Sequence, residues 1–101
     1  MSWLARACAR DVVVAADPDV VLLHGVAVLR RLGARITRYD AEAGTAEARL
    51  RRFARPALVR LQAEAAGPAT TRLHVESDAL VWAPMFRRFR GDLLLLERST
   101  S

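Results

Sequence analysis

The longest regular pattern of apolar and polar positions runs from Asp17 to Gly33 and predicts one amphipathic helix. Its apolar stripe recurs at helical spacing, at Val21, Gly25, Val28, Leu29 and Leu32. Further apolar residues widen this surface and predict packing neighbours on two sides: Leu23, Val26 and Ala27. Asp17 followed by Pro18 is typical of a helix start, and Gly33 is typical of a left-handed helix end. Gly25 in mid-helix predicts close approach of another backbone, that of a sheet.

Alternation of apolar and polar residues with a period of two predicts strands on both sides of this helix. The expected strands are Val12–Val14, reaching back to about Ala5, and then residues 35–40, 45–53, 57–65 and 70–78. The segment Asp40–Gly44 predicts a hairpin turn in which Gly44 takes a positive φ, and residues 54–56 predict a break.

A second helix is expected from Pro84 to about Arg98, with Gly91-Asp92 as a point where it could divide. Residues 79–83 fit either an extension of the last strand or a loop. The order strand, helix, four strands, helix predicts a two-layer α+β sandwich in a single domain, residues 1–101. Chain directions close if the fifth strand pairs antiparallel with the first. We therefore expect a five-stranded antiparallel sheet of order 2-3-4-5-1, with both helices on its apolar face.

The composition adds little to this picture. The net charge of +5 comes from arginine alone, and an Ala- and Arg-rich chain without lysine is typical of a GC-rich genome. The charge is therefore weak support for a nucleic-acid partner. The single Cys8 excludes an internal disulfide and fits a reducing compartment. No apolar run reaches the roughly 20 residues of a transmembrane helix, and no signal-peptide pattern is found, so a cytoplasmic protein is expected.

The segment Leu29–Arg51, LRRLGARITRYDAEAGTAEARLR, resembles a recurring bacterial pattern. In that pattern a helix ends in Leu-Gly, a strand follows, and an Asp-x-x-x-Gly hairpin leads to the next strand. The segment is therefore similar to small bacterial α+β domains and to the repeated domain of the outer-membrane assembly lipoprotein BamC. The order of elements also resembles the half-repeat of the TATA-binding protein and the smaller helix-grip domains.

The motif match covers Leu32-Gly33 and Asp40–Gly44, which are cap and turn residues, so the resemblance implies a fold and no chemistry. The chain lacks the lipoprotein signal of the envelope members, and Ala34 stands where many members have an aromatic residue. Location and partner are therefore not carried over from the resemblance.

The polar side of the predicted sheet is the first candidate interaction surface, because its charges alternate in sign. Alternation suits cross-strand Arg–Glu pairs on a solvated face, and it also suits a protein partner, a second copy or a nucleic acid. The candidate residues are Arg35, Tyr39, Arg49, Arg51, Arg60, Arg72 and His74. With Tyr39 as its one aromatic residue, this face lacks the stacking pairs of RNA-reading sheets and the apolar wedges of minor-groove binders.

The second candidate is a pocket between the sheet and the C-terminal helix. Its expected lining is Trp82, Met85, Phe86 and Phe89, residues that equally predict an ordinary core. Three arginines are interleaved with these aromatic residues: Arg87, Arg88 and Arg90. Such a pattern occurs in helices that bind nucleic acids or membranes, and more often in solvated amphipathic helices.

The sequence contains no grouping typical of catalysis or metal binding. His24, His74 and Cys8 have no motif partner at ligand spacing, and a Cys8–His74 pair across neighbouring strands is the one geometric option. We therefore expect no cofactor and no enzymatic activity. The expected function is a non-enzymatic interaction or scaffold module that acts through its sheet face or an edge strand as a homodimer. The alternatives are a binder of small apolar ligands and nucleic-acid binding through the arginine surface.

Overall fold

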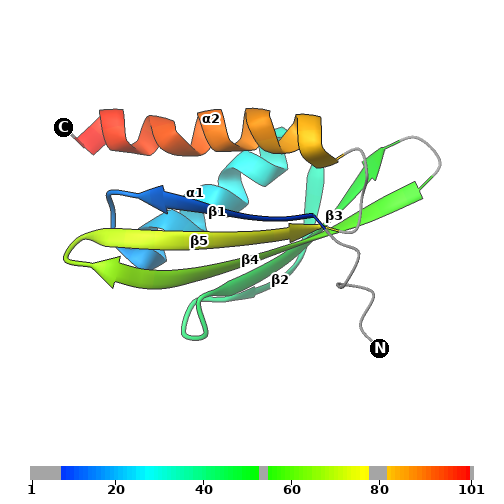
Figure 1. The fold of residues 1–101 in the computed structure, drawn as a ribbon. Coiled ribbons are helices and arrows are strands. Elements are labelled where there is room, and N and C mark those ends of the chain that lie inside the picture. Colours follow the sequence, from blue (N-terminus) through cyan, green and yellow to red (C-terminus); the bar gives the residue numbers. More distant parts are fainter. Residues whose placement is uncertain (1–7, 53–54, 78–81, 101) are drawn as a thin grey trace.

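A computed structural model contains a five-stranded antiparallel sheet and two helices that pack on one of its faces (Figure 1). In chain order the elements are β1 (Cys8–Val14), α1 (Pro18–Arg31), β2 (Ala34–Asp40), β3 (Thr45–Arg52), β4 (Arg55–Gly67), β5 (Thr70–Ser77) and α2 (Trp82–Thr100). The structure describes residues 8–52, 55–77 and 82–100, without the side chains of residues 8, 51–52, 55–56, 82–85 and 96–100. The strand order is β1-β5-β4-β3-β2, which confirms the predicted fold class and the predicted order.

The ends of α1 lie close to those that the sequence predicts. Asp17 precedes the helix in an extended conformation, and Pro18 is its first residue. Asp17 does not form the expected side-chain cap. In the first turn, the N–H of Val20 instead donates a hydrogen bond to Asp19 Oδ1 at 2.9 Å. After the helix, Gly33 has a φ of 97°, the left-handed conformation expected of it.

The apolar stripe of α1 packs directly on the sheet. All of its five predicted members are buried. Gly25 faces the sheet, but side chains lie against it instead of the predicted backbone, because a Cβ at this position would lie 3.1 Å from Leu61 Cδ1 of β4. Val26 is buried as well, and α1 contacts α2 in addition to the sheet, which confirms the predicted neighbours on two sides, whereas Leu23 and Ala27 are exposed.

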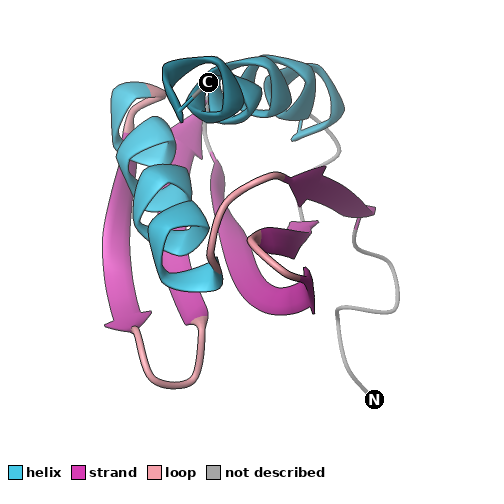
Figure 2. Cartoon of the chain, turned by 90° about the vertical axis from the view of Figure 1, so that its left-hand side faces the viewer, coloured by secondary structure: helices cyan, strands magenta, loops and turns pink. Residues whose placement is uncertain are grey.

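α2 is one continuous helix through Gly91-Asp92, so the possible division is not observed. It contacts α1 and β1, and both helices lie on the same side of the sheet (Figure 2). Phe89 and Leu93 are fully buried. His24 Nε2 of α1 lies 3.3 Å from the carbonyl oxygen of Asp92, which gives this histidine a structural role. Over their described residues, neither helix combines the length and the hydrophobicity that a membrane crossing needs.

A register shift in β2, between Ile36 and Arg38, changes which side chains reach each face of the sheet. Side chains alternate along a strand, so one extra residue reverses the faces that follow it. Arg38 lies opposite Glu47, whereas Tyr39 lies opposite the buried Ala46. Tyr39 is therefore on the helix side of the sheet, where it is 44% exposed, and its expected place on the polar side is corrected.

The turn between β2 and β3 is fixed to β4. Gly44 has the predicted positive φ, 71°, and Asp40 Oδ1 accepts a hydrogen bond from the N–H of Ala43 at 3.0 Å. The N–H of Ala63 donates to the carbonyl of Gly44 at 2.8 Å. A Cβ at Gly44 would lie 2.8 Å from the Ala63 carbonyl oxygen, so only glycine fits at this position.

β4 is longer than predicted, because it begins at Arg55 and ends at Gly67. Pro56 pairs with Arg51 inside the ladder, so the predicted break does not include residues 55 and 56. Proline is tolerated near the start of a strand, where the missing N–H removes one ladder bond. Of the segment 79–83, whose structure the sequence leaves open, residues 79–81 lie outside the described residues, and residues 82–83 belong to α2.

Candidate functional site

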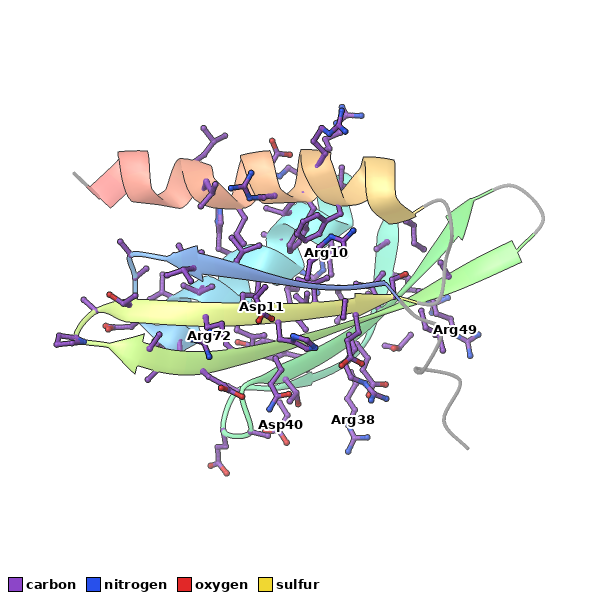
Figure 3. The ribbon with its side chains drawn as sticks, viewed as in Figure 1. Arg10, Asp11, Arg38, Asp40, Arg49 and Arg72 are labelled. Carbon is purple, nitrogen blue, oxygen red and sulfur yellow. The ribbon has the colours of Figure 1, made fainter. Side chains whose placement is uncertain are left out.

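The sheet face opposite the helices, here called the polar face, carries charged side chains from all five strands (Figure 3). The antiparallel register orders them in rows that cross the sheet. One row contains Asp11, His74, Gln62, Thr45 and Asp40, and the next contains Ala9, Glu76, Arg60, Glu47 and Arg38. Two further rows flank these. Beside the row of Asp11, a third row contains Val13, Arg72 and Glu64, and beside the row of Glu76, a fourth contains Leu58, Arg49 and Arg35. Neighbours in a row have Cβ atoms about 5 Å apart, so they interact directly.

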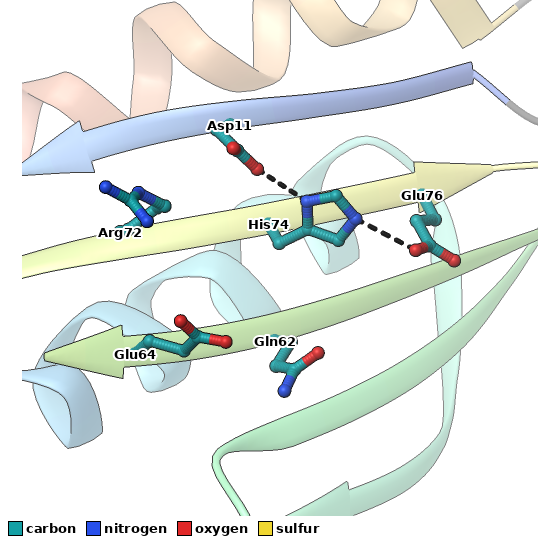
Figure 4. Close-up of a pocket in the computed structure, with 6 residues that line it drawn as sticks. All are labelled: Asp11, Gln62, Glu64, Arg72, His74 and Glu76. Atoms are coloured by element: carbon teal, nitrogen blue, oxygen red, sulfur yellow. Dashed lines mark hydrogen bonds and ion pairs between the residues drawn. The ribbon is translucent and has the colours of Figure 1, made fainter.

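His74 is held between two carboxylates on this face (Figure 4). Its Nδ1 lies 2.5 Å from Asp11 Oδ1 on β1, and its Nε2 lies 2.8 Å from Glu76 Oε1 on β5. Ionised carboxylates only accept hydrogen bonds, so both ring nitrogens must donate, and only the imidazolium form can do this. His74 therefore carries a positive charge in this geometry and ties β1 to β5 across the polar face.

The surroundings of His74 favour that charge. The hydrogen bond to Asp11 raises the pKa of His74 above its usual 6.5 and is the largest influence. Partial burial acts in the opposite direction, and the hydrogen bond to Glu76 and the charges of both carboxylates outweigh it. The second oxygen of Glu76, Oε2, is buried and has no hydrogen-bond partner among the described residues.

An open depression of about 310 Å³ surrounds this group. It is lined by Asp11, Gln62, Glu64, Arg72, His74 and Glu76 (Figure 4). None of these side chains is a hydroxyl, thiol or amine nucleophile, and both N–H groups of His74 are already engaged, so the ring cannot accept a proton. Within residues 8–52, 55–77 and 82–100, no three His, Cys, Asp or Glu side chains are placed to hold a metal ion. The arrangement suits non-covalent contact better than catalysis.

The β2–β3 side of the polar face is basic. Arg35 lies directly opposite Arg49 in the register, and Arg38 lies opposite Glu47. Glu47 is already engaged, because its Oε2 lies 3.4 Å from Arg60 Nε. Arg35, Arg38 and Arg49, here called the arginine cluster, form no ion pair with any side chain that the structure describes.

Most of the predicted interaction residues lie on the polar face: Arg35, Arg49, Arg60, Arg72 and His74. The backbone of Arg51 is in β3, but its side chain lies outside the description. Arg38 joins the face because of the bulge that removes Tyr39 from it. No local pattern indicates a bulge at Thr37, so the sequence could not predict this exchange.

Of the predicted pocket beside α2, the structure describes the two phenylalanine side chains, and both pack in the core. Phe89 is fully buried, Phe86 packs on the core, and their ring centroids are 6.3 Å apart. A Cβ at Gly25 would lie 3.8 Å from Phe89 Cζ, so the ring of Phe89 packs beside α1. Trp82 and Met85 belong to α2, and their side chains lie outside the described residues.

The partners of His74 are not among the features that the sequence predicts. β1 pairs with β5 as expected, but the register places Cys8 opposite Ser77 and Asp11 opposite His74. The considered Cys8–His74 pair is therefore not adjacent in the ladder. The alternation of His74 and Glu76 on one strand is the available signal, whereas Asp11 requires the register between strands that are far apart in the sequence.

The fold and the site define a small two-layer α+β domain with one charged sheet face that neither helix covers. Comparisons with protein-family models and with curated proteins find no match for this chain. Its function is therefore inferred from the polar face alone.

Proposed function

We propose that this protein is a non-enzymatic interaction module that associates through its polar face as a homodimer. The observation that supports this most is that both helices cover one side of a five-stranded sheet and leave the other side open. That open side carries clusters of opposite charge and a polar depression, and no group on it is arranged for a reaction among the side chains that the structure describes. Complementary charge is the usual means by which polar protein surfaces select a partner and fix its orientation.

The polar face is a better candidate than the sheet edges. β1 lies beside α2 and carries Arg10 opposite the buried Val75, so a charged residue lies on the helix side of this edge strand. β2, at the other edge, contains the bulge around Thr37. Inward charges and bulges are both features by which proteins prevent strand pairing at an edge. Face-to-face association is therefore favoured over edge-to-edge association.

Nucleic-acid binding is less well supported. The bulge turns Tyr39 to the helix side, so no aromatic ring lies on the polar face within the described part of the sheet. Single-stranded nucleic acids bind such sheets by stacking bases on aromatic rings, and the carboxylates around His74 would repel phosphates. The absence of a mobility shift at low salt would dismiss this alternative.

Binding of a small apolar ligand beside α2 is also less well supported, because Phe89 and Gly25 are already in close packing there. A ligand that bound the folded state would raise the melting temperature. Screening apolar compounds for such an increase tests this alternative directly.

The homodimer is tested by sedimentation equilibrium at concentrations from about 1 μM to about 1 mM, the range of weak specific association. We expect the mean mass to rise from that of one chain to that of two. Because the proposed contact is ionic, raising the salt to about 1 M, where charges are screened beyond about 3 Å, should shift the equilibrium toward monomers. A mass of one chain throughout this range would contradict the proposal.

A further inference from the structure

We infer that two copies of this chain bind face to face, with the arginine cluster of each protomer against the carboxylates of the other. The carboxylate cluster consists of Asp11, Glu64 and Glu76. This inference names the contact surface of the homodimer proposed above and rests on that proposal. It follows from three features of the polar face: the separation of its charges, one unfavourable pair within it, and the strand order.

Charges of opposite sign are separated across the polar face. Its β1–β5 side, with the adjoining end of β4, carries the three carboxylates of the carboxylate cluster. Among the described side chains there, Arg72 and the His74 imidazolium are the cations that partly balance them. Its β2–β3 side holds the arginine cluster, where Glu47 is bonded to Arg60. The nearby Asp40 is turned toward its own turn by the bond from Ala43. Figure 3 shows the two sides, with Asp11 and Arg72 apart from Arg38 and Arg49.

The pair Arg35–Arg49 indicates that the arginine cluster is incomplete in one chain. Like charges directly opposite one another destabilise a sheet. The row that contains them continues to Leu58 of β4, so it offers no carboxylate as far as that strand. A carboxylate from outside the chain would relieve this repulsion and bind both guanidinium groups, for which the Arg geometry is well suited.

The strand order allows a second copy to supply that carboxylate. β4 is the central strand of β1-β5-β4-β3-β2. A half-turn about an axis that lies in the interface, passes over the middle of β4 and is perpendicular to the line between the two clusters places the arginine cluster of one copy over the carboxylate cluster of the other. The same operation forms the contact twice, because a two-fold interface is self-complementary. An unrelated acidic partner would use one cluster and leave the other cluster without a role.

The size of the polar face sets the expected strength. Five strands spaced about 4.8 Å apart, with seven to eight residues of about 3.3 Å each, provide about 600 Å² per protomer. Stable specific interfaces bury about 800 Å² per partner, so this dimer lies at the low end of the range and should be weak and sensitive to salt. Val13 is 54% exposed on this face and adds apolar contact beside Arg72.

Charge reversal with complementation tests this arrangement. One variant, R35E/R49E, makes the basic side acidic, and a second, D11K/E64K, makes the acidic side basic. Each alone should dimerise at least about tenfold more weakly than the unaltered chain, because both contacts become repulsive. An equimolar mixture should form a one-to-one heterodimer, because both contacts then join opposite charges. Sedimentation measures the affinities, and native mass spectrometry identifies the heterodimer.

Controls separate this contact from other effects. R87E/R88E changes the net charge by the same amount as R35E/R49E does. Its two substitutions lie on α2, away from the polar face, so this variant should dimerise like the unaltered chain. Circular dichroism and thermal melting establish that each variant is folded.

The possible outcomes each decide the question. If the unaltered chain and both variants dimerise equally, the homodimer stands and the face-to-face contact is overturned. If both variants are folded and monomeric but their mixture stays monomeric, the pairing of the two clusters is overturned. If the unaltered chain is monomeric at every concentration, the proposed homodimer fails and this contact fails with it. If a labelled oligonucleotide competes with dimer formation and binds through Arg35 and Arg49, the arginine cluster belongs to a polyanion site and the inference is overturned.

Discussion

The two faces of the sheet are built from the same strands and have opposite physical roles. On the helix side, Val, Leu and Ala side chains are buried under α1 and α2, and α1 approaches closely enough for Gly25 to contact Leu61. On the polar face, side chains from neighbouring positions are charged and exposed, and they interact through ion pairs. Burial of apolar area contributes far more to folding than exposed ion pairs do. Stability therefore resides on the helix side, while the polar face is free to recognise a partner.

The largest expected effect is a difference in unfolding free energy between substitutions at two adjacent residues of β5. Leu73 is fully buried on the helix side, and Arg72 is exposed on the polar face. Leu73→Ala should lower the free energy of unfolding by about 2–5 kcal/mol, because it removes core contacts and leaves a cavity. Arg72→Ala should change it by less than about 0.5 kcal/mol. Urea denaturation at low protein concentration measures both, and equal losses would refute the division of roles between the faces.

An intermediate effect sharpens the account of close packing on the helix side. In α2, a Cβ added at Gly91 would meet no atom within 4 Å, so Gly91→Ala should stabilise the helix by about 1 kcal/mol. In α1, the same change at Gly25 places a Cβ 3.1 Å from Leu61 Cδ1, so packing opposes the gain in helix propensity. Thermal melting should rank Gly91→Ala above Gly25→Ala. The reverse order would show that α1 does not lie so close to the sheet.

The smallest expected effect concerns His74 on the polar face. Because the folded state raises the pKa of His74, its bonds to Asp11 and Glu76 stabilise the fold fully below pH 6.5, the pKa of the unfolded chain. This stabilisation is lost as the pH rises through the higher folded-state pKa. The free energy of unfolding should therefore fall toward that of His74→Gln as the pH rises above 6.5 and through the raised pKa of His74.

Urea denaturation of both proteins across this range measures that difference, and His24, whose ring contacts a backbone carbonyl, provides a matched control as His24→Gln. A constant difference between the unaltered chain and His74→Gln would contradict the assignment of an imidazolium to His74.

The order of elements could be predicted from the sequence because its signals are local. Asp17-Pro18 and Gly33 delimit a helix, and Asp40–Gly44 delimit a hairpin, whatever the rest of the chain does. With the directions of the strands known, closure of the sheet by β1 and β5 follows from antiparallel pairing.

The site could be predicted only in part, because it depends on register between distant strands. Alternation, which is a local property, identifies the candidate arginines. The bulge at Thr37 replaces Tyr39 with Arg38, and the β1–β5 register brings Asp11 to His74. Both depend on non-local hydrogen bonding, and neither leaves a pattern within a single segment.

The bulge in β2 and the inward Arg10 in β1 also limit how large an assembly can become. Every open sheet has two borders, so growth by strand addition would have no natural end and would produce ribbons. Both borders are unsuitable for strand addition, so if the polar face pairs as proposed, that contact surface is used up when two molecules meet. Crowding this protein should then yield a saturating pair instead of fibres.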